Sequence, residues 1–594
     1  MNLKDALKKA FTEKGVSLEI GQNKDRNRII LTLGAKGKKQ AVAVTYGTSQ
    51  GRKPTQIVEG RDKRNRTSLV SPPMLEKNEQ DLKLPTHSVT TASVSKTTPI
   101  KKSPVVPKPL AKVRIGADAK CLVGIADKRT HELLKINVAF TGKESIDQIA
   151  KPEIREMAFG LDFGTSSVKV VIGDMAADKA YAVPFLKAQG IDAYLLPSRV
   201  FESSAIGMFG AHGFSLTSGD TSFRDLKLSL LANPDSVDLQ VEVIAFLALV
   251  IQRARGWFFQ THASIYKRVR CLWQLRIGLP AATALKNKFV PLLENILRAS
   301  WKVAAIKGDL DRKLIQQIRD DVFNQEGSDE DPEVRVIPEI AAQIFGFVAS
   351  SSFDKKAANR YLMVDVGAGT VDASLFKVSP SRGGRWSFEF YTALVQPYGV
   401  SNLHAHRVDW WLSKLSEAHG ASHLYEALSM TKFATDLGAT LPVHNHEYFS
   451  GVELIDSDPG KADEEFFDKK LMAQVQGSTL WRAVKDGFLS KEQLKDIPMF
   501  LCGGGARSNF FLELEKKLQH YPGFSWLSIE PWQLGFPGDL EISDIDERDF
   551  DRLSVAYGLS KVDVGEITQA VPLPKVKLEP QESFTNRYID KDQT

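Results

Sequence analysis

Residues 159–174 read Phe159-Gly-Leu-Asp-Phe-Gly-Thr-Ser-Ser-Val-Lys-Val-Val-Ile-Gly-Asp174. Apolar residues lead into Asp162, a Gly-Thr-Ser-Ser turn follows, and a β-branched run leaves it, which predicts a β-hairpin. At its tip, Gly164 lets backbone N–H groups approach an anion closely, and the hydroxyls of Thr165 and Ser166 can donate to phosphate oxygens. Taken alone, the stretch fits an ordinary Gly-Thr-Ser turn equally well.

A second stretch repeats this pattern. Residues 361–376 read Tyr361-Leu-Met-Val-Asp-Val-Gly-Ala-Gly-Thr-Val-Asp-Ala-Ser-Leu-Phe376, with an apolar strand, Asp365, a Gly-x-Gly-Thr turn and another strand. Two such hairpins, about 200 residues apart, indicate internal duplication. We expect the two tips to face each other across a cleft and to hold one polyphosphate and its metal. The carboxylate of Asp162 suits a hydrated Mg2+.

A third stretch, residues 499–511, reads Met499-Phe-Leu-Cys-Gly-Gly-Gly-Ala-Arg-Ser-Asn-Phe-Phe511. It predicts a strand, a triple-glycine turn and the start of a helix. Such a turn lets a flat base or a phosphate lie against bare backbone.

Together these stretches resemble the phosphate-one, phosphate-two and adenosine motifs of the actin / sugar kinase / heat-shock 70 ATPase superfamily. Within it the sequence is most similar to the heat-shock 70 (DnaK-like) ATPase domain. Residues 485–505 resemble that family's run into its adenosine motif, and residues 551–558 resemble its last core helix. The resemblance covers roughly residues 158–563 and implies an α/β, two-lobed, actin-like fold of duplicated ribonuclease H-like lobes.

The resemblance also implies a site. Lys227 occupies the position of the catalytic lysine, which neutralises charge on the transferred phosphoryl group, and Glu339 would hold water or accept a proton. Alternatively, Lys227 is a surface lysine and Glu339 only stabilises a helix N-terminus. The implied catalytic residues are Lys227, Glu339, Asp365 and Thr370; the implied phosphate and nucleotide contacts are Gly164, Thr165, Ser166, Gly367, Gly369, Thr370, Gly503, Gly504, Gly505 and Arg507; and Asp162 and Asp365 would hold Mg2+ through water.

The sequence departs from the family in several places. Ala368 replaces a glycine often present in the second hairpin, and Gly399 stands alone where two glycines are usual. Glu426 and Lys432 are the nearest candidates for contacts to the base. The peptide-binding domain and helical lid of the family do not follow, so we expect output through the N-terminal module, the tail or a separate partner.

Composition sets the broad class. A chain of 594 residues predicts two or three domains, and 43% hydrophobic and 25% charged residues are typical of a soluble globular protein. The three cysteines are too dispersed for a disulfide framework or a zinc site. The longest apolar run is too short to cross a bilayer, and no signal segment is visible, so no membrane association and a cytoplasmic location are expected.

Residues 1–70 are interpreted as a small basic α+β module, with a helix over 2–14 and a hairpin of 28–33 with 40–46. Residues 71–112 are expected to be a disordered linker. Accessory strands, near 120–126 and 133–140 within residues 113–157, have no predicted attachment. The ATPase spans 158–563, and 564–594 form a flexible tail.

Residues 1–113 contain 23 Lys and Arg against 9 Asp and Glu, which fits a solvated basic face better than a nucleic-acid site.

The expected function is therefore an ATP- and ADP-binding, Mg2+-dependent, slowly hydrolysing ATPase. Nucleotide-dependent closure of its lobes would be coupled to a protein partner in a chaperone-like or regulatory role. Three alternatives remain: a filament-forming actin-like ATPase, a small-molecule kinase of the same superfamily, and a nucleotide-binding scaffold without turnover.

Overall fold

The computed structural model describes the backbone of three strands before residue 46, and most of residues 113–571. The undescribed residues within that second range are 125–131, 137–151, 204–206, 210–219, 286–288, 307–309, 325–330, 351–352, 417, 419, 433–440, 456, 520–525 and 562–563. The predicted helix over 2–14 and the predicted linker over 71–112 lie outside the described residues. The chain forms two compact units, Met1–Val105 and Val106–Thr594.

The first unit contains an antiparallel sheet of β1 (Ser17–Gln22), β2 (Arg28–Ala35) and β3 (Lys38–Thr45), in the order β1-β2-β3. The predicted hairpin is therefore present. Its strands run further into the turn than expected, because Ala35 pairs with Lys38 and only two residues connect them. The sequence did not predict β1.

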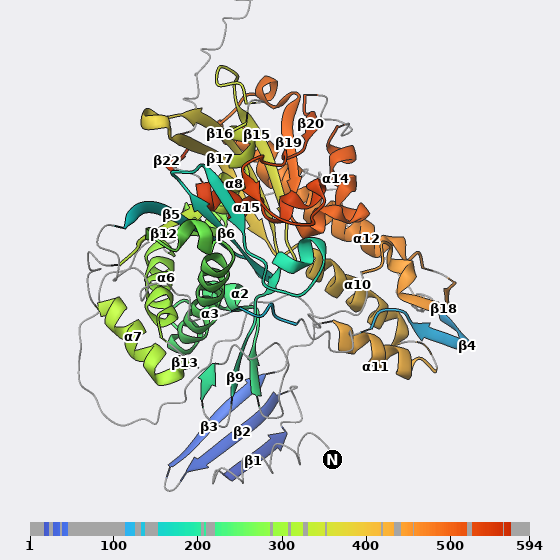
Figure 1. Cartoon of the computed structure of the whole chain (residues 1–594). Coiled ribbons are helices and arrows are strands. Elements are labelled where there is room, and N and C mark those ends of the chain that lie inside the picture. The colour runs from blue at the N-terminus through green and yellow to red at the C-terminus, as the bar shows by residue number, and fades with distance from the viewer. Residues whose placement is uncertain are drawn as a thin grey trace, which may run out of the picture. The chain divides into compact units, whose positions relative to one another are not determined.

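The second unit is built on two sheets (Figure 1). The first has the order β14-β12-β5-β6-β7-β21, and β8 also pairs with β6. The strands β5, β6 and β7 are antiparallel neighbours, and β12 and β14 continue parallel to β5. Their bounds are β5 (Glu153–Phe163), β6 (Ser167–Asp174), β7 (Lys179–Ala182), β8 (Leu196–Pro197), β12 (Val269–Leu279), β14 (Glu333–Pro338) and β21 (Leu540–Glu541).

The second sheet repeats this order as β20-β19-β15-β16-β17-β22. Again three antiparallel neighbours, β15, β16 and β17, are followed by two strands, β19 and β20, that run parallel to the first of them. Their bounds are β15 (Arg360–Val366), β16 (Val371–Pro380), β17 (Trp386–Gln396), β19 (Ile497–Cys502), β20 (Ile529–Trp532) and β22 (Val564–Gln569). The same succession of strands in both sheets confirms the predicted duplicated, two-lobed α/β fold.

Opposite faces of the first sheet are covered by different helices. Alternate residues such as Phe159 and Leu161 point into the large apolar core with α3 (Val237–Thr261), α6 (Val290–Ala304) and α7 (Arg312–Asn324). On the other face, α15 (Ser554–Lys561) lies directly on backbone, and a Cβ at Gly160 would come within 2.3 Å of the Ala556 carbonyl oxygen. The last helix that the structure describes thus completes the first lobe.

Each lobe carries an outer part. The first lobe adds a four-stranded sheet in the order β11-β9-β10-β13, and the second adds α10 and α11 beneath the ribbon of β18 and β4 (Figure 1). Bounds here are β9 (Val200–Ser203), β10 (Met208–Phe209), β11 (Asp220–Phe223), β13 (Leu310–Asp311), α2 (Leu226–Ala232), α10 (Val400–Leu415), α11 (Ser422–Thr431), β18 (Phe449–Leu454) and β4 (Val113–Cys121).

Shorter helices connect these elements. They are α4 (Ala263–Tyr266), α5 (Ala281–Ala284), α8 (Glu339–Gln343), α9 (Phe345–Val348), α12 (Gly460–Phe466), the π-helix η5 (Phe467–Trp481), α13 (Arg482–Lys485) and α14 (Asn509–Gln519), with single 3-10 turns at Gly190–Tyr194, Arg382–Gly384, Asn445–Tyr448, Lys491–Leu494, Gly504–Arg507 and Glu547–Arg552. In the described part of the chain, no helix combines the length and the apolar character that crossing a membrane requires.

Three expectations about the ends of the predicted ATPase region need correction. The strand expected near 120–126 is β4 at Val113–Cys121, and it pairs with β18 of the second lobe. In the predicted segment 133–140, the described residues contribute a single bridge, Leu133 with Leu186. The segment expected to be a flexible tail begins with strand β22, which pairs with β17. This pairing covers a sheet edge that would otherwise be open.

Candidate functional site

A cavity of about 330 Å3 lies between the lobes, where the two hairpin tips and the triple-glycine turn meet. Twelve of the residues singled out from sequence line it: Asp162, Gly164, Thr165, Ser166, Lys227, Glu339, Asp365, Gly367, Thr370, Gly503, Gly504 and Gly505. Most of the site expected from sequence is thus brought together in one place.

The two hairpin tips touch each other. The first tip joins β5 to β6 and the second joins β15 to β16. A Cβ placed on Gly369 would lie 3.4 Å from Cγ2 of Thr165 and 3.3 Å from Cδ1 of Leu228. Gly369 therefore sits at the contact between the tips, beside the lining of the cavity.

The second tip is held by the start of α10. The N–H groups of Val400 and Ser401 donate to the carbonyls of Gly367 and Ala368, at 3.2 and 2.8 Å. A Cβ at Gly399 would lie 2.5 to 2.7 Å from the backbone of this turn, so only glycine allows the approach. The backbone of Ala368 has a negative φ. Alanine is therefore tolerated at a position where the family often has glycine.

Two lysines form ion pairs with carboxylates in the cavity wall. Lys227, near the start of α2, is 8% exposed and donates to Oε1 of Glu339, the first residue of α8. The alternative that Lys227 is a surface lysine is therefore wrong. Lys169 of β6 donates to Oδ2 of Asp162 at 2.9 Å.

The carboxylates that face these pairs are crowded. Burial, with Glu339 and Asp162 nearby, raises the pKa of Asp365 to about 7. Burial and the neighbouring Glu339 likewise raise the pKa of Asp372 to about 7. Burial also raises the pKa of Glu339, against the opposing effect of the Lys227 ammonium. Bringing carboxylates together in a low dielectric disfavours their ionised forms, so the cavity favours a positive charge.

Neutral donors hold the two aspartates in place. Gln343 donates to Oδ2 of Asp365 at 3.0 Å. The hydroxyl of Ser374 and the backbone N–H of Ala281 donate to the two oxygens of Asp372, at 3.1 and 3.2 Å. These contacts orient the carboxylates and leave their charge uncompensated.

This donor set fits a hydrated divalent cation. Hard oxygen ligands suit Mg2+, which keeps several of its waters, and a cation would relieve the crowding that raises the pKa of Asp365 and Asp372. In the part of the chain that the structure describes, no three His, Cys, Asp or Glu side chains are close enough to hold a metal directly. A cation here would therefore be bound through water.

Arg507 does not contact the nucleotide cavity as the sequence predicted. Its guanidinium does not line the cavity, and instead donates to Asp549, to Asp551 at 2.6 Å and to the Arg548 carbonyl. Arg552 takes its place at the glycine turn, because its Cζ lies 3.0 Å from where a Cβ of Gly504 would be.

Sequence reasoning missed several lining residues, among them Lys169, Gln343, Asp372 and Arg552. Three of these four are related by position to an identified residue. Asp372 comes two residues after Thr370, Gln343 lies four after Glu339 on α8, and Lys169 is directly opposite Asp162 in the hairpin register. Glu426 and Lys432, the candidates for base contacts, do not line the cavity, and Lys432 bonds Asp409 at 2.6 Å.

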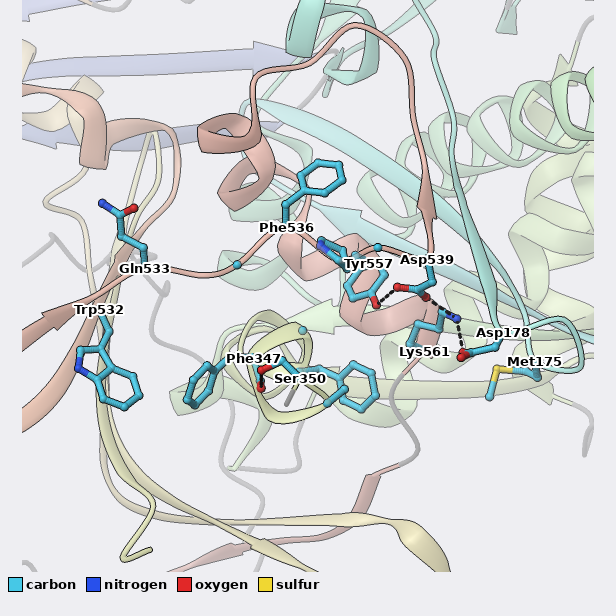
Figure 2. Close-up of a pocket in the computed structure, with 16 residues that line it drawn as sticks. Met175, Asp178, Phe347, Ser350, Trp532, Gln533, Phe536, Asp539, Tyr557 and Lys561 are labelled. Atoms are coloured by element: carbon cyan, nitrogen blue, oxygen red, sulfur yellow. Dashed lines mark hydrogen bonds and ion pairs between the residues drawn. The ribbon is translucent and has the colours of Figure 1, made fainter. Parts of the chain in front are cut away.

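A second, larger cavity of about 750 Å3 has a different character (Figure 2). It is lined by α9, by residues 532–539 and by α15, with aromatic walls that include Phe347, Trp532 and Phe536. At one end Lys561 is paired with Asp178 and Asp539, at 2.8 and 2.6 Å. None of the site residues expected from sequence lines this cavity.

No protein-family model and no curated protein sequence matches the chain. Among solved structures, it is similar to MreB 5 of Spiroplasma citri in a crystal structure with bound AMPPNP. The identity is 12% and the TM-score 0.32, over 68% of this chain and 94% of the other. The strand orders of the two sheets carry the assignment of an actin-like fold.

Proposed function

We propose that this chain binds ATP and ADP with Mg2+ in the cavity between the two hairpins, and that it hydrolyses ATP slowly. The observation that supports this most is the convergence of two glycine-bearing tips and a triple-glycine turn on one cavity that also holds Lys227, Glu339 and Asp365. Backbone N–H groups, hydroxyls and a lysine together suit a polyphosphate, and the carboxylates suit its metal.

Each group has a task in this proposal. The tips bind and orient the phosphates through their backbone N–H groups and the hydroxyls of Thr165 and Thr370. Lys227 exchanges its bond with Glu339 for the terminal phosphate and stabilises the charge that develops there. Glu339, freed of the ammonium, accepts a proton from the attacking water. Bound Mg2+ would neutralise phosphate charge, and Asp162 and Asp365 would hold it through water.

Both activities are tested with purified full-length protein. Calorimetry measures binding of the nucleotide, and phosphate release measures hydrolysis. We expect Lys227→Ala and Asp365→Asn to lower turnover by about 100-fold or more, while a nucleotide still binds. Lys516→Ala is the matched control, because Lys516 is an exposed lysine that pairs with Glu513 on α14. Unchanged turnover in either site variant would reject these roles, and the absence of any binding of adenine nucleotide with Mg2+ would reject the site.

The finer proposal is a heat-shock 70-like ATPase that couples lobe closure to a protein partner. It is supported by the motifs of residues 159–174, 361–376 and 485–505. Affinity purification of the full chain, and of a chain that lacks residues 1–112, in ATP and in ADP should yield a partner whose retention depends on the nucleotide. Nucleotide-dependent sedimentation of the pure protein would favour a filament-forming ATPase instead. Transfer of phosphate to glycerol or a sugar would favour a kinase.

A further inference from the structure

The second cavity, of about 750 Å3, lies where the chain passes between the two lobes (Figure 2). Two of the connecting segments line it: α9, on the path from β14 to β15, and residues 532–539, which lead from β20 to β21. The turn between β6 and β7 and the helix α15, both of the first lobe, complete the wall. We call this space the junction cavity, because elements of the lobes and of their connections enclose it.

Aromatic rings form much of the wall, and other rings hold them from behind. The ring of Phe347 packs edge-on against that of Trp532, with 5.4 Å between the centroids. On the other side of the cavity, Phe550 supports the rings of Tyr557 and Phe536, at 5.6 and 5.7 Å. Such contacts fix the rings in place. The apolar lining is therefore formed without a ligand, as is usual for small-molecule sites of roughly 300–1,000 Å3.

Two glycines leave bare backbone in this wall. Gly535 and Gly538 line the cavity, and neither has a positive φ. A Cβ at either position would meet no atom of the described residues within 4 Å. Neither the backbone conformation nor packing against the described residues therefore requires glycine here, and open space adjoins both positions. That space is available to a ligand.

The charged groups of the lining gather at one end, and their sum is negative. Lys561 donates to Asp178 at 2.8 Å and to Asp539 at 2.6 Å, and its side chain is only 6% exposed. The hydroxyl of Tyr557 also donates to Asp539, at 2.8 Å. Two carboxylates thus share one ammonium, and the side chain of Asp178 is 92% exposed. An anionic ligand would meet excess negative charge at this end, whereas a cation would be attracted.

We propose that the junction cavity binds a small organic cation with a flat apolar body. The body lies among Phe347, Trp532 and Phe536, and the ammonium faces Asp178. The faces of aromatic rings also attract a cation. A nucleotide does not suit this chemistry, because Lys561 is the only cation in the described lining and two carboxylates already engage it. The proposal goes beyond the nucleotide site and does not depend on it.

Three probes with the same indole body test the charge of the ligand. Tryptamine is a cation, tryptophol is neutral and indole-3-acetate is an anion. Saturation-transfer NMR with purified full-length protein, in the absence of nucleotide, gives a dissociation constant for each probe. We expect tryptamine to bind with a dissociation constant on the order of 1 mM, as its small size allows.

Tryptophol should bind about tenfold more weakly than tryptamine, because it lacks the partly exposed ion pair and the cation–π contact. Indole-3-acetate should bind more weakly still. No detectable binding of tryptamine would overturn the proposal, as would equal affinities of the three probes or the reverse order.

Asp178→Asn tests where the ammonium lies. Asp178 has φ of +51°, a conformation that asparagine also adopts, so the substitution removes the charge and keeps the turn. Tryptamine should then bind as weakly as tryptophol, and the affinity of tryptophol should stay unchanged. Asp544→Asn is the matched control, because Asp544 has φ of +57° and does not line the cavity. Undiminished tryptamine binding in Asp178→Asn would overturn the proposal.

The nucleotide cavity also carries excess carboxylates, so it can attract the same probe. Asp365→Asn removes one of them, and tryptamine binding should not change. A loss of affinity in Asp365→Asn without a loss in Asp178→Asn would place the cation in the nucleotide cavity and overturn the proposal. Because no nucleotide is present, failure of the proposed ATPase function leaves this result unaffected.

A variant that fills the cavity tests where the apolar body lies. Gly535→Leu with Gly538→Leu places two side chains in the open space and should abolish binding of both tryptamine and tryptophol, while the melting temperature stays that of wild type. Gly124→Leu is the control, because Gly124 also has no positive φ and no described atom within 4 Å of a Cβ, and does not line the cavity. Unchanged binding of both probes in the filled variant would overturn the proposal.

Discussion

The two hairpins have the same shape and opposite electrostatics. In the first, Asp162 is directly opposite Lys169 in the register of β5 and β6, and the two side chains form an ion pair. In the second, Asp365 is directly opposite Asp372 in the register of β15 and β16, and both carboxyls have a pKa raised to about 7. The scaffold is duplicated, and the residue opposite the aspartate decides whether the tip is neutralised by a lysine or is crowded by a second carboxyl.

The largest effect is expected from breaking the neutralised tip. The side chains of Lys169 and Asp162 are 13% and 9% exposed, so Lys169→Met leaves a buried carboxylate without its cation. Loss of one partner of a buried pair costs about 3–5 kcal/mol. Urea denaturation and thermal melting should show this loss, and Lys169→Met with Asp162→Asn should recover most of it. A single variant as stable as the double variant would contradict the ion pair.

A smaller effect of opposite sign is expected at the second tip. Between its ordinary value of 3.8 and the raised value of about 7, folded Asp365 retains a proton that the unfolded chain releases. This carboxyl therefore makes the free energy of unfolding fall as pH rises through that window. Asp365→Asn removes this dependence of stability on pH. At pH 8 it should raise the free energy of unfolding of the nucleotide-free protein by about 2 kcal/mol, which is a fraction of the energy that corresponds to the full pKa shift. At pH 4 it should not stabilise the protein.

Thermal melting at pH 4 and pH 8 measures this difference. Asp372→Asn is the informative companion, because Ser374 and Ala281 donate to different oxygens of the Asp372 carboxylate. The NH2 group that replaces one of these oxygens cannot accept a hydrogen bond, so one of the two bonds is lost. The melting temperature at pH 8 should rise less in Asp372→Asn than in Asp365→Asn. Equal melting differences at the two pH values would reject the raised pKa.

The same asymmetry predicts how pH affects binding of the nucleotide with Mg2+. At pH 6 a carboxyl with a pKa of about 7 is mostly protonated, and it must lose that proton before it can face a cation. Binding measured by calorimetry should therefore be about tenfold weaker at pH 6 than at pH 8. In Asp365→Asn this change with pH should shrink. A wild-type affinity that does not vary with pH would mean that these carboxyls do not face the metal.

The smallest effect concerns the shape of the second tip. Ala368 has ordinary negative φ, unlike the glycines that require special conformations. Ala368→Gly should therefore cost about 0.5–1 kcal/mol through the freedom it gives the unfolded chain. Nucleotide affinity should stay within twofold of wild type. A gain in affinity would indicate that the alanine side chain obstructs the phosphate site.

Sequence could predict the scaffold and the glycine-bearing turns of the cavity because local chemistry specifies them. A strand, an aspartate and a glycine turn are contiguous, and their repetition at Asp162 and Asp365 implies two related lobes. The sequence does not show in the same way that Lys169 lies opposite the first aspartate and Asp372 opposite the second. This contrast depends on which residues are opposite each other in a register, and the pKa depends on burial.

The errors have a common physical origin in distant partners. Arg507 was assigned to the nucleotide because it follows the glycine turn, but its carboxylate partners are 42 and 44 residues further along the chain. The attachment of β4 depends on β18, which begins at Phe449. The first strand after the predicted ATPase boundary, β22, was missed because its short run of residues becomes a strand only beside β17.

The bare backbone beneath α15 has a consequence for biosynthesis. Gly160 and Gly173 leave no side chain to cover their face of the first sheet, and residues 556–560 lie directly on them. The first lobe is translated early, but this face stays uncovered until the ribosome has released the far end of the chain. Nascent protein therefore waits with an incomplete lobe, and a stop codon before residue 554 should be as damaging as a deletion in the middle of the sheet.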